Sequence, residues 1–335
     1  MAVLVTGGIG MIGSNVVRRL ALQAGDEVVV LDRAHKPSAV TPLSGLGDRV
    51  HYVNGSVTDL SLILRVIKEY RVDAIVHLAA LIAGECTERP VEAMEINVMG
   101  TVNILEAARL EKIAGRVIVL SASAVMGGPA DVVTPVSEDE VLLPATGIYT
   151  ITKLTAEQLV NCYRDTFGVD AVAIRPKAVY GPGIPQTTYV QPIPAMIAAA
   201  LAGEDVVRPS GADTKTDLTY AKDEAGGIVR LLKHPEPLPR YVYNLSSGER
   251  VSHGDVAKIL GEIFPGQRFE LGPGLAEGVL ASGSQTDSVW RMIERPPHSV
   301  ANAKKDFGFN PTWPATRALR DYVRWLQTGE YGDFD

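Results

Sequence analysis

A glycine-rich segment stands directly after the first apolar run, and it limits the possible folds more than any other feature of the chain. The apolar run at 3–5 leads into the segment 6–13, Thr-Gly-Gly-Ile-Gly-Met-Ile-Gly. Its glycines satisfy Gly-x-Gly-x-x-Gly at 8, 10 and 13 and Gly-x-x-Gly-x-x-Gly at 7, 10 and 13. Glycine permits positive φ angles, close approach to a phosphate, and tight packing of helix on strand. The segment predicts a turn from a strand into a helix whose first amides face a dinucleotide.

Short β-branched runs alternate with longer, helix-like segments through the first half of the chain. The predicted strands are Val3–Thr6, Val28–Asp32, Ala74–Leu78, Val117–Ser121 and Ala171–Arg175. The predicted helices are Ile12–Ala24, Leu60–Glu69, Val91–Leu110 and Ile148–Phe167. Strands that alternate with helices favour a parallel sheet with helices on both faces. The predicted fold class is therefore α/β, with a Rossmann-type doubly wound parallel sheet.

A carboxylate at the end of the second predicted strand indicates which dinucleotide the turn holds. Asp32 stands 19 residues after Gly13. At this place an acid accepts hydrogen bonds from the adenosine ribose hydroxyls and repels a 2′-phosphate, so NAD is favoured over NADP. Arg33 could weaken that preference, because a guanidinium can pair with a phosphate. The alternative interpretation of Asp32 is an ordinary strand-end carboxylate.

The pattern becomes less regular after 181–183, Gly-Pro-Gly, and richer in proline. We therefore predict an NAD-binding Rossmann domain over residues 1–178 and a smaller C-terminal α/β lobe over 179–335. This lobe mainly binds substrate, and some of its segments return to the Rossmann domain. The acidic segment after Thr328 is expected to be frayed.

Composition argues against several classes of protein. The chain is 46% hydrophobic and 21% charged, as is typical of folded domains. Its net charge is -7 and it has no basic block, so nucleic acid is not an expected partner. It lacks both a long apolar run and a signal-peptide start, so we expect no membrane partner and a cytoplasmic location. The two cysteines and six histidines are scattered, and no metal site is expected.

Tyr149 and Lys153 are the candidate acid-base pair. Four residues apart in a predicted helix, they share one face. A phenol has a pKa near 10, so a neighbouring cation and the nicotinamide charge are needed to stabilise its phenolate near neutral pH. The pair predicts a proton shuttle for hydride transfer, although the same spacing on an exposed helix face carries no function.

Further segments match one known family. They are 77–80 (His-Leu-Ala-Ala), 97–108 (Asn-Val-Met-Gly-Thr-Val-Asn-Ile-Leu-Glu-Ala-Ala), 175–183 (Arg-Pro-Lys-Ala-Val-Tyr-Gly-Pro-Gly), 217–223 (Asp-Leu-Thr-Tyr-Ala-Lys-Asp) and 307–311 (Phe-Gly-Phe-Asn-Pro). With the glycine-rich turn and the Tyr/Lys pair, they resemble the extended short-chain dehydrogenase/reductase family, also called the NAD-dependent epimerase/dehydratase family. The resemblance spans nearly the whole chain.

The resemblance implies a role for particular residues. Tyr149 would act as acid or base, Lys153 would lower its pKa and hold the nicotinamide ribose, and a serine would bond the reacting oxygen. The backbone of Ala79 and Ala80 would line the ribose and pyrophosphate, and 176–179 would close over the nicotinamide. A homodimer joined by helices near 92–110 and 149–166 is also implied. The expected cofactor-binding residues are Gly7, Gly10, Met11, Ile12, Gly13, Asp32, Arg33, Ser56, Val57, Leu78, Ala79, Ala80, Asn97, Tyr149, Lys153, Pro176 and Val179.

The segment 121–127 departs from the family pattern. Ala122 stands where relatives usually have the catalytic serine or threonine. Ser123 is the favoured replacement, and Ser121 or a water molecule is the alternative. Dehydratases of the family place an Asp-Glu pair where this chain has Ser123 and Ala124, which cannot perform that acid-base chemistry. Epimerisation beside a ketone needs a cysteine or lysine near Ala124, which alanine cannot replace.

Two further departures concern the substrate. Ala178 and Thr216 stand where nucleotide-sugar enzymes of the family usually have asparagine and arginine. The loss of a donor and a cation weakens the case for a nucleotide diphosphate ligand. Lys177, Lys215 and Arg291 could bind a smaller anion or lie solvated on the surface.

These observations favour an NAD-dependent oxidoreductase with a small-molecule substrate. It would transfer a hydride from a hydroxyl-bearing carbon of a sugar, sugar acid or related polyhydroxy compound. One alternative is a sugar-nucleotide 4-epimerase with tightly bound NAD. A catalytically weak, redox-sensing protein that keeps the dinucleotide site is another.

Overall fold

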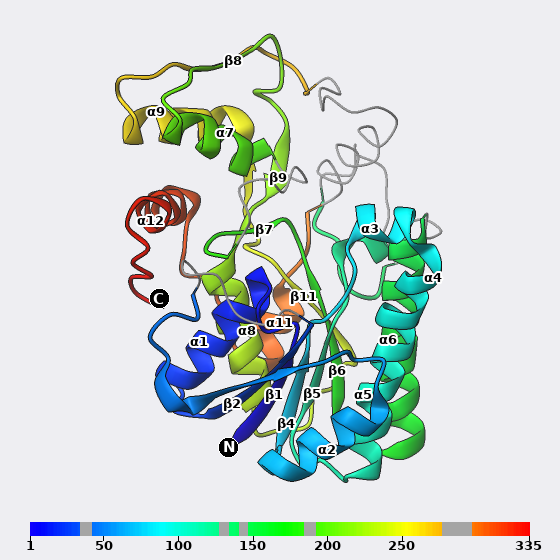
Figure 1. The fold of residues 1–335 in the computed structure, drawn as a ribbon. Coiled ribbons are helices and arrows are strands. Elements are labelled where there is room, and N and C mark those ends of the chain that lie inside the picture. The colour runs from blue at the N-terminus through cyan, green and yellow to red at the C-terminus, as the bar shows by residue number, and fades with distance from the viewer. Residues whose placement is uncertain (34–41, 127–133, 141–146, 184–191, 277–296) are drawn as a thin grey trace.

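The computed structural model is built around a parallel sheet of seven strands in the order β11-β6-β5-β4-β1-β2-β3 (Figure 1). It describes residues 1–33, 42–126, 134–140, 147–183, 192–276 and 297–335. The strands are β1 (Ala2–Thr6), β2 (Glu27–Asp32), β3 (Val50–Asn54), β4 (Ala74–His77), β5 (Val117–Leu120), β6 (Ala171–Pro176) and β11 (Val242–Leu245). Their carboxyl ends therefore meet at one edge of the sheet, where ligands of open α/β sheets bind.

Helices cover both faces of the sheet, as the sequence predicts. On one face lie α1 (Met11–Leu22), α8 (Ala221–Lys233) and α11 (Ala301–Phe307), and on the other lie α2 (Leu60–Tyr70), α5 (Gly100–Leu110) and α6 (Ile148–Phe167). The first strand alternates between them, with Val3 and Val5 in one core and Leu4 in the other. This alternation with a period of two buries every residue of β1.

Each of the five predicted strands and four predicted helix regions is present, with ends shifted by two residues or fewer. Two sheet strands, β3 and β11, were not predicted. The helix expected over 91–110 is continuous but contains a π-helical segment, Met94–Met99, between α4 (Pro90–Ala93) and α5. Such π-helical turns are often found at functional sites. The short helix α3 (Ala83–Glu88) precedes α4.

The second half of the chain contributes both to the sheet and to a smaller lobe. Strand β11 pairs with β6, and α8 packs on α1. The lobe has its own apolar core, formed largely by α7 (Pro192–Leu201), α9 (His253–Ile263) and α12 (Ala315–Thr328). Its short strand pairs are β7 (Val179–Tyr180) with β10 (Thr219–Tyr220), β8 (Val206–Arg208) with β13 (Phe269–Leu271), and β9 (Lys215–Asp217) with β12 (Arg250–Ser252).

The segment after Thr328 does not fray, contrary to the prediction. Tyr331 is only 6% exposed, and its hydroxyl bonds Asn15 on α1. The acidic composition suggested a solvated end, but the segment also contains aromatic residues that fill a site on the folded body. In the parts of the chain that the structure describes, no helix has the length and apolar character needed to cross a bilayer.

Candidate active site

The glycine-rich turn has the shape that its sequence predicts. Gly7 follows β1 with a φ of 67°. A methyl group on Gly7 would lie 2.7 Å from the backbone nitrogen of Ala79, and one on Gly13 would lie 2.2 Å from the carbonyl oxygen of Gly7. Glycine is therefore required at both positions. Helix α1 begins at Met11 after the N-cap Gly10. Because glycine has no side chain to cap the helix, the first amides remain for a ligand, and the turn fits a pyrophosphate.

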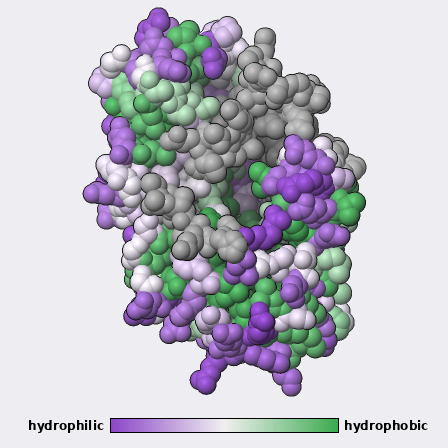
Figure 2. Space-filling model, viewed as in Figure 1, coloured by the Kyte–Doolittle hydropathy of each residue, from purple (hydrophilic) through white to green (hydrophobic). Residues whose placement is uncertain are grey.

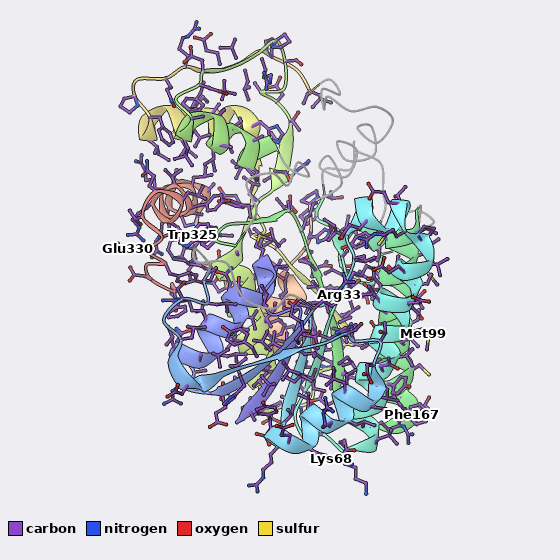
Figure 3. All side chains as sticks on the ribbon, in the orientation of Figure 1. Arg33, Lys68, Met99, Phe167, Trp325 and Glu330 are labelled. Carbon is purple, nitrogen blue, oxygen red and sulfur yellow. The ribbon has the colours of Figure 1, made fainter. Side chains whose placement is uncertain are left out.

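Asp32 lies beside this turn at the end of β2. Its Oδ2 accepts a hydrogen bond from the N–H of Ile9 at 3.1 Å, which fixes the carboxylate next to the glycines. Arg33, labelled in Figure 3, has a side chain that is 55% exposed. Its guanidinium forms an ion pair with Glu92 of α4 at 3.1 Å. The guanidinium is thereby held by a carboxylate on a neighbouring element.

Ser56 and Val57 follow β3 and lie next to the end of β2. The N–H of Gly55 donates to the carbonyl oxygen of Asp32 at 2.9 Å. The Ser56 hydroxyl lies 2.8 Å from that of Thr58. Val57 is buried against Gly100, and a methyl group on Gly100 would lie 2.6 Å from the Cγ2 of Val57. The structure therefore brings these two residues to the same edge as Asp32.

The segment after β4 forms the opposite side of the glycine turn. Leu78 donates from its N–H to the carbonyl oxygen of Thr6 at 3.1 Å, and the N–H of Ala79 donates to the Thr6 hydroxyl at 3.3 Å. Ala79 and Ala80 are half-buried. They lie beside the glycine turn, after the carboxyl end of β4.

His77, the last residue of β4, is a packed residue of this edge. Its Nδ1 lies 2.7 Å from the Thr6 hydroxyl and its Nε2 lies 3.3 Å from that of Thr101. Burial, with the charge of Lys153, lowers the pKa of His77 to about 3. The imidazole is neutral at physiological pH and connects β1 to α5.

Asn97 lies in the π-helical segment and joins three elements. Its Oδ1 accepts from the N–H of Leu81 at 2.8 Å, and its Nδ2 donates to the carbonyl oxygen of Leu81 at 3.0 Å and to the Thr152 hydroxyl at 3.1 Å. Thr152 lies between Tyr149 and Lys153 on α6. The buried amide therefore fixes α6 against the loop that follows β4, a contact that sequence spacing does not reveal.

Tyr149 and Lys153 occupy the first two turns of α6. The Nζ of Lys153 lies 5.9 Å from the centre of the Tyr149 ring and donates to the carbonyl oxygen of Leu120 at 2.7 Å. Burial lowers the pKa of Lys153 to about 8 and raises the pKa of Tyr149 above its ordinary value. The ammonium remains predominantly charged at neutral pH, so it can stabilise a neighbouring phenolate.

The structure separates the two serines considered for the reacting oxygen. Ser121 is fully buried and donates to Glu157 at 2.5 Å, and Glu157 also forms a two-point ion pair with Arg175 at 2.8 and 2.7 Å. The hydroxyl of Ser121 thus belongs to an internal network that joins β5, α6 and β6. Ser123 begins a 3-10 turn, Ser123–Met126, and is only partly buried. The geometry favours Ser123 over Ser121.

The connection from β6 to β7 carries the predicted residues Pro176 and Val179. Between them, Ala178 has a φ of 44°, a left-handed conformation that asparagine adopts more readily than alanine. Its carbonyl oxygen accepts from the N–H of Thr219 at 3.3 Å, next to the pairing of β7 with β10. The backbone thus keeps a tight turn at Ala178, although the side-chain amide of the usual asparagine is absent.

The three cations considered as anion ligands differ in where they lie and in what is known of their contacts. Lys177 is 3% exposed and forms an ion pair with the fully buried Asp217 at 3.3 Å. Its ammonium is therefore already paired with a carboxylate, and it does not lie solvated on the surface. Lys215 lies exposed on β9, and Arg291 falls outside the described residues. Thr216 is buried beside Asp217.

The space-filling view shows a hollow between the sheet body and the lobe (Figure 2). The strand ends on the sheet side carry the glycine turn, Asp32 and the segment 78–80. Within the described part of the chain, no group of three or more His, Cys, Asp or Glu side chains is placed to hold a metal ion. The arrangement is that of a dinucleotide site, and the helix with Tyr149 and Lys153 begins at the same edge of the sheet.

A doubly wound sheet with this turn, a strand-end acid and a Tyr/Lys helix defines an NAD-dependent enzyme of the short-chain dehydrogenase/reductase type. Residues 3–246 match the model of the NAD dependent epimerase/dehydratase family. The chain belongs to this family, and NAD is its cofactor.

Several relatives align over nearly the full chain. The chain is 25% identical to UDP-glucose 4-epimerase from Halalkalibacterium halodurans, an alignment that covers 91% of this chain and 99% of that protein. It is 30% identical to dTDP-4-dehydro-6-deoxy-D-allose reductase from a Streptomyces species, with coverage of 97% and 96%. Among solved structures, it is similar to MoeE5 in complex with UDP-glucose and NAD, with a TM-score of 0.75, 27% identity and coverage of 98% and 99%. The UDP-glucose 4-epimerase of Thermotoga maritima shares the fold, with a TM-score of 0.81, 22% identity and coverage of 98% and 99%.

Proposed function

We propose that this protein removes a hydride from a hydroxyl-bearing carbon of a sugar or sugar-like compound, with Tyr149 and Lys153 as its acid-base pair. The observation that carries the proposal is the placement of both side chains on the first turns of α6, with Lys153 bonded to the end of β5. At that edge of the sheet lie also the glycine turn and Asp32.

Proton transfer is the task of Tyr149. Bound NAD supplies the nicotinamide ring that accepts the hydride. As the hydride leaves the carbon, the phenolate of Tyr149 accepts the hydroxyl proton, and the carbonyl product forms. Burial is the main cause that raises the pKa of Tyr149, so the ammonium of Lys153 and the cofactor's positive charge must offset this rise. The hydroxyl of Ser123 bonds the reacting oxygen and orients it toward Tyr149.

The cofactor site follows the edge of the sheet from β3 to β6. The glycine turn and the first amides of α1 hold the pyrophosphate, Asp32 bonds the adenosine ribose, and Lys153 bonds the nicotinamide ribose. We assign to this site Gly7, Gly10, Met11, Ile12, Gly13, Asp32, Arg33, Ser56, Val57, Leu78, Ala79, Ala80, Asn97, Tyr149, Lys153, Pro176 and Val179. In this division of the chain, residues 1–178 hold NAD, and the lobe within 179–335 binds most of the substrate.

The residues after β5 argue against dehydration. Some relatives are named dTDP-glucose 4,6-dehydratase, such as that of Neisseria meningitidis at 27% identity. Removal of a hydroxyl as water requires an acid and a base in addition to Tyr149. Ser123 and the buried Ala124 provide neither.

A sugar-nucleotide 4-epimerase is the second candidate. It is favoured by the full-length similarity to UDP-glucose 4-epimerase, and it needs the same tyrosine, lysine and NAD. Ala178 and Thr216 lack the amide and the guanidinium that would bind a diphosphate, which favours a smaller substrate.

One experiment separates the two candidates. The purified protein is assayed for bound NAD and then supplied with NAD and a panel of nucleotide sugars, aldoses, aldonates and small alcohols. Net NADH formation with one of these compounds supports the oxidoreductase. Conversion of a nucleotide sugar into its 4-epimer, with bound NAD and without net NADH, supports the epimerase and rejects net oxidation.

A homodimer is part of this proposal. Large apolar side chains are exposed along the helix from α4 to α5 and on α6, among them Val91 at 72%. Met99 at 50% and Phe167 at 49% are labelled in Figure 3. Such a patch is typical of a surface covered by a partner. We take the partner to be a second copy, because the resemblance places the subunit contact on these two helices. Light scattering should give a dimer for the wild type and a monomer for Val91→Glu combined with Met99→Glu, and a monomeric wild type excludes the arrangement.

A further inference from the structure

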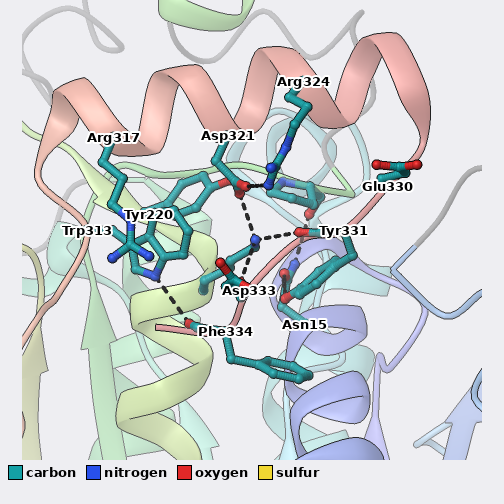
Figure 4. A network of polar contacts seen from close by, with 12 residues as sticks. Asn15, Tyr220, Trp313, Arg317, Asp321, Arg324, Glu330, Tyr331, Asp333 and Phe334 are labelled. Atoms are coloured by element: carbon teal, nitrogen blue, oxygen red, sulfur yellow. Dashed lines mark hydrogen bonds and ion pairs between the residues drawn. The ribbon is translucent and has the colours of Figure 1, made fainter.

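The segment Gly329–Asp335, which we call the strap, runs from the end of α12 to α1 (Figure 4). The hydroxyl of Tyr331 donates to the Oδ1 of Asn15 at 2.5 Å, and the guanidinium of Arg18 lies 4.6 Å from the centre of the Tyr331 ring. The carbonyl oxygen of Phe334 accepts from the indole N–H of Trp313 at 3.2 Å. The strap therefore connects the lobe to the helix that follows the glycine turn.

A buried lysine makes the strap part of the folded structure. Lys222 is fully buried, and its Nζ contacts the Oδ2 of Asp321 at 2.7 Å and the carbonyl oxygens of Tyr331 and Asp333 at 2.5 and 2.7 Å (Figure 4). An ammonium group has three N–H donors, and two of these three acceptors belong to the strap. Undocking the strap would leave a buried charge with one acceptor, which is strongly unfavourable.

Asn15 links the strap to the first turn of α1, next to the glycine turn. Its Nδ2 donates to the carbonyl oxygens of Met11 and Pro182, each at 2.8 Å. Pro182 belongs to the loop 181–183, in which Gly183 has a φ of 95° and packs so closely that a methyl group would lie 3.2 Å from the Cα of Met11. The amide of Asn15 thus holds this loop on the first turn of α1.

Tyr331 determines which way that amide faces. The two carbonyl oxygens accept only from Nδ2, because Oδ1 has no hydrogen to donate. The hydroxyl of Tyr331 satisfies Oδ1 on the other side, so the amide is held with Nδ2 toward Met11 and Pro182. Without this hydroxyl, Oδ1 would be left without that partner in a buried site, at a cost that weakens the whole arrangement.

We propose that Tyr331 is a positioning residue of the cofactor site: through Asn15 it holds the loop 181–183 against α1 and slows the release of NAD. The inference rests on the proposed cofactor site, in which the first turn of α1 binds the pyrophosphate. The same loop continues the connection 176–179, which is assigned to the nicotinamide. In this proposal the connection separates from α1 when the cofactor leaves, and the contacts of Asn15 with Met11 and Pro182 oppose that separation.

The test is the dissociation rate of NADH from the full-length protein. It is measured by the loss of NADH fluorescence after mixing the complex with excess NAD. Loss of one buried hydrogen bond in Tyr331→Phe should raise this rate about tenfold. The matched control is Tyr243→Phe, which removes a buried hydroxyl that donates to Asp306 at 2.9 Å, away from the strap. It should keep the wild-type rate even if its melting temperature falls.

A double-mutant cycle separates positioning from general stability. Asn15→Ala should raise the rate at least as much as Tyr331→Phe, and the combined variant should release NADH no faster than Asn15→Ala alone.

Two results overturn the proposal, and they differ. A folded Tyr331→Phe protein with the wild-type dissociation rate rejects the role of Tyr331 and leaves the cofactor site intact. A wild-type protein that does not bind NADH rejects the cofactor site itself, and with it the role of the strap.

Discussion

Lys153 donates from Nζ to the carbonyl oxygen of Leu120 at 2.7 Å, which ties the second turn of α6 to the last residue of β5. This contact fixes the ammonium at the carboxyl edge of the sheet. Burial lowers its pKa to about 8, and most molecules therefore still carry the charge at pH 7. The charge stands 5.9 Å from the centre of the Tyr149 ring, where it can stabilise a phenolate.

Tyr149→Phe tests the acid-base assignment. Since the ring is retained, NAD affinity should stay within about twofold of the wild type, whereas turnover should fall roughly a hundredfold or more, the usual scale for positioned proton transfer. NAD titration and steady-state rates with the substrate found in the panel measure the two effects. Tyr163→Phe, on the same helix, is the matched control. Unchanged turnover in the Tyr149 variant would reject the assignment.

Ser123→Ala and Ser121→Ala distinguish the two serines. If Ser123 bonds the reacting oxygen, its loss should lower turnover roughly a hundredfold, as the loss of one preorganised donor does. Ser121→Ala should instead lower the free energy of unfolding by about 1–3 kcal/mol, because Glu157 loses a buried hydrogen bond. Steady-state rates and urea unfolding of both variants give the comparison. Wild-type turnover in Ser123→Ala would mean that a water molecule or another group bonds the oxygen.

Local patterns predict the elements of the site well. The glycine turn, the end of β2 and the spacing of Tyr149 and Lys153 each lie within one short stretch of sequence, and the structure has them as expected. The sequence does not predict strand β3, because this edge strand leaves Tyr52 and Asn54 exposed and His51 only partly buried, so it has no continuous apolar run. Strand β11 belongs to the sheet through its pairing with β6, which no local pattern encodes.

Most features of the site that the sequence does not predict depend on contacts between residues far apart in the chain. The sequence presents Lys177 as a candidate surface cation, but folding pairs it with Asp217, forty positions away. Asn97 stays a prediction for the cofactor site, and the structure adds contacts from its amide to Leu81 and Thr152 that residue spacing does not reveal. The acidic composition of the strap predicts a frayed end. In the structure, however, Lys222 donates to the carbonyl oxygen of Tyr331, 109 positions away. In each case burial of a polar group becomes possible only once a remote partner is in place.

Asp32→Ala tests the choice between NAD and NADP. Removal of the carboxylate removes both the ribose acceptor and the repulsion of a 2′-phosphate, so the ratio of kcat/KM for NAD to that for NADP should fall at least about tenfold, or 1.4 kcal/mol. If the ratio is unchanged, another residue recognises the ribose.

Glu92→Gln tests whether its ion pair with Arg33 at 3.1 Å contributes to that choice. With the carboxylate gone, the Arg33 guanidinium becomes available to a 2′-phosphate, and kcat/KM for NADP should rise while that for NAD stays constant. Glu88→Gln on α3 is the control for removing one charge nearby. If Arg33→Ala combined with Glu92→Gln keeps the gain, the guanidinium is not its cause.

Glu224→Gln should change how stability depends on pH. Glu224 on α8 is fully buried, and in the described structure neither oxygen has a hydrogen-bond partner. Burial, with the charge of Asp223, raises its pKa well above 4.5. The unfolded chain therefore releases this proton first as the pH rises above 4.5, and the folded chain retains it. The free energy of unfolding falls over that interval, by at most about 1.4 kcal/mol per pH unit.

Urea unfolding of the wild type and of Glu224→Gln over a series of pH values measures this term. Because glutamine does not ionise, the variant should lose less stability than the wild type as the pH rises from 4.5, and the difference should stop growing once the pH passes the pKa of Glu224 in the folded protein. Glu69→Gln, at an exposed position of α2, controls for the loss of one negative charge. Parallel stability curves for the wild type and Glu224→Gln would show that the carboxyl ionises in the folded protein as readily as in the unfolded chain.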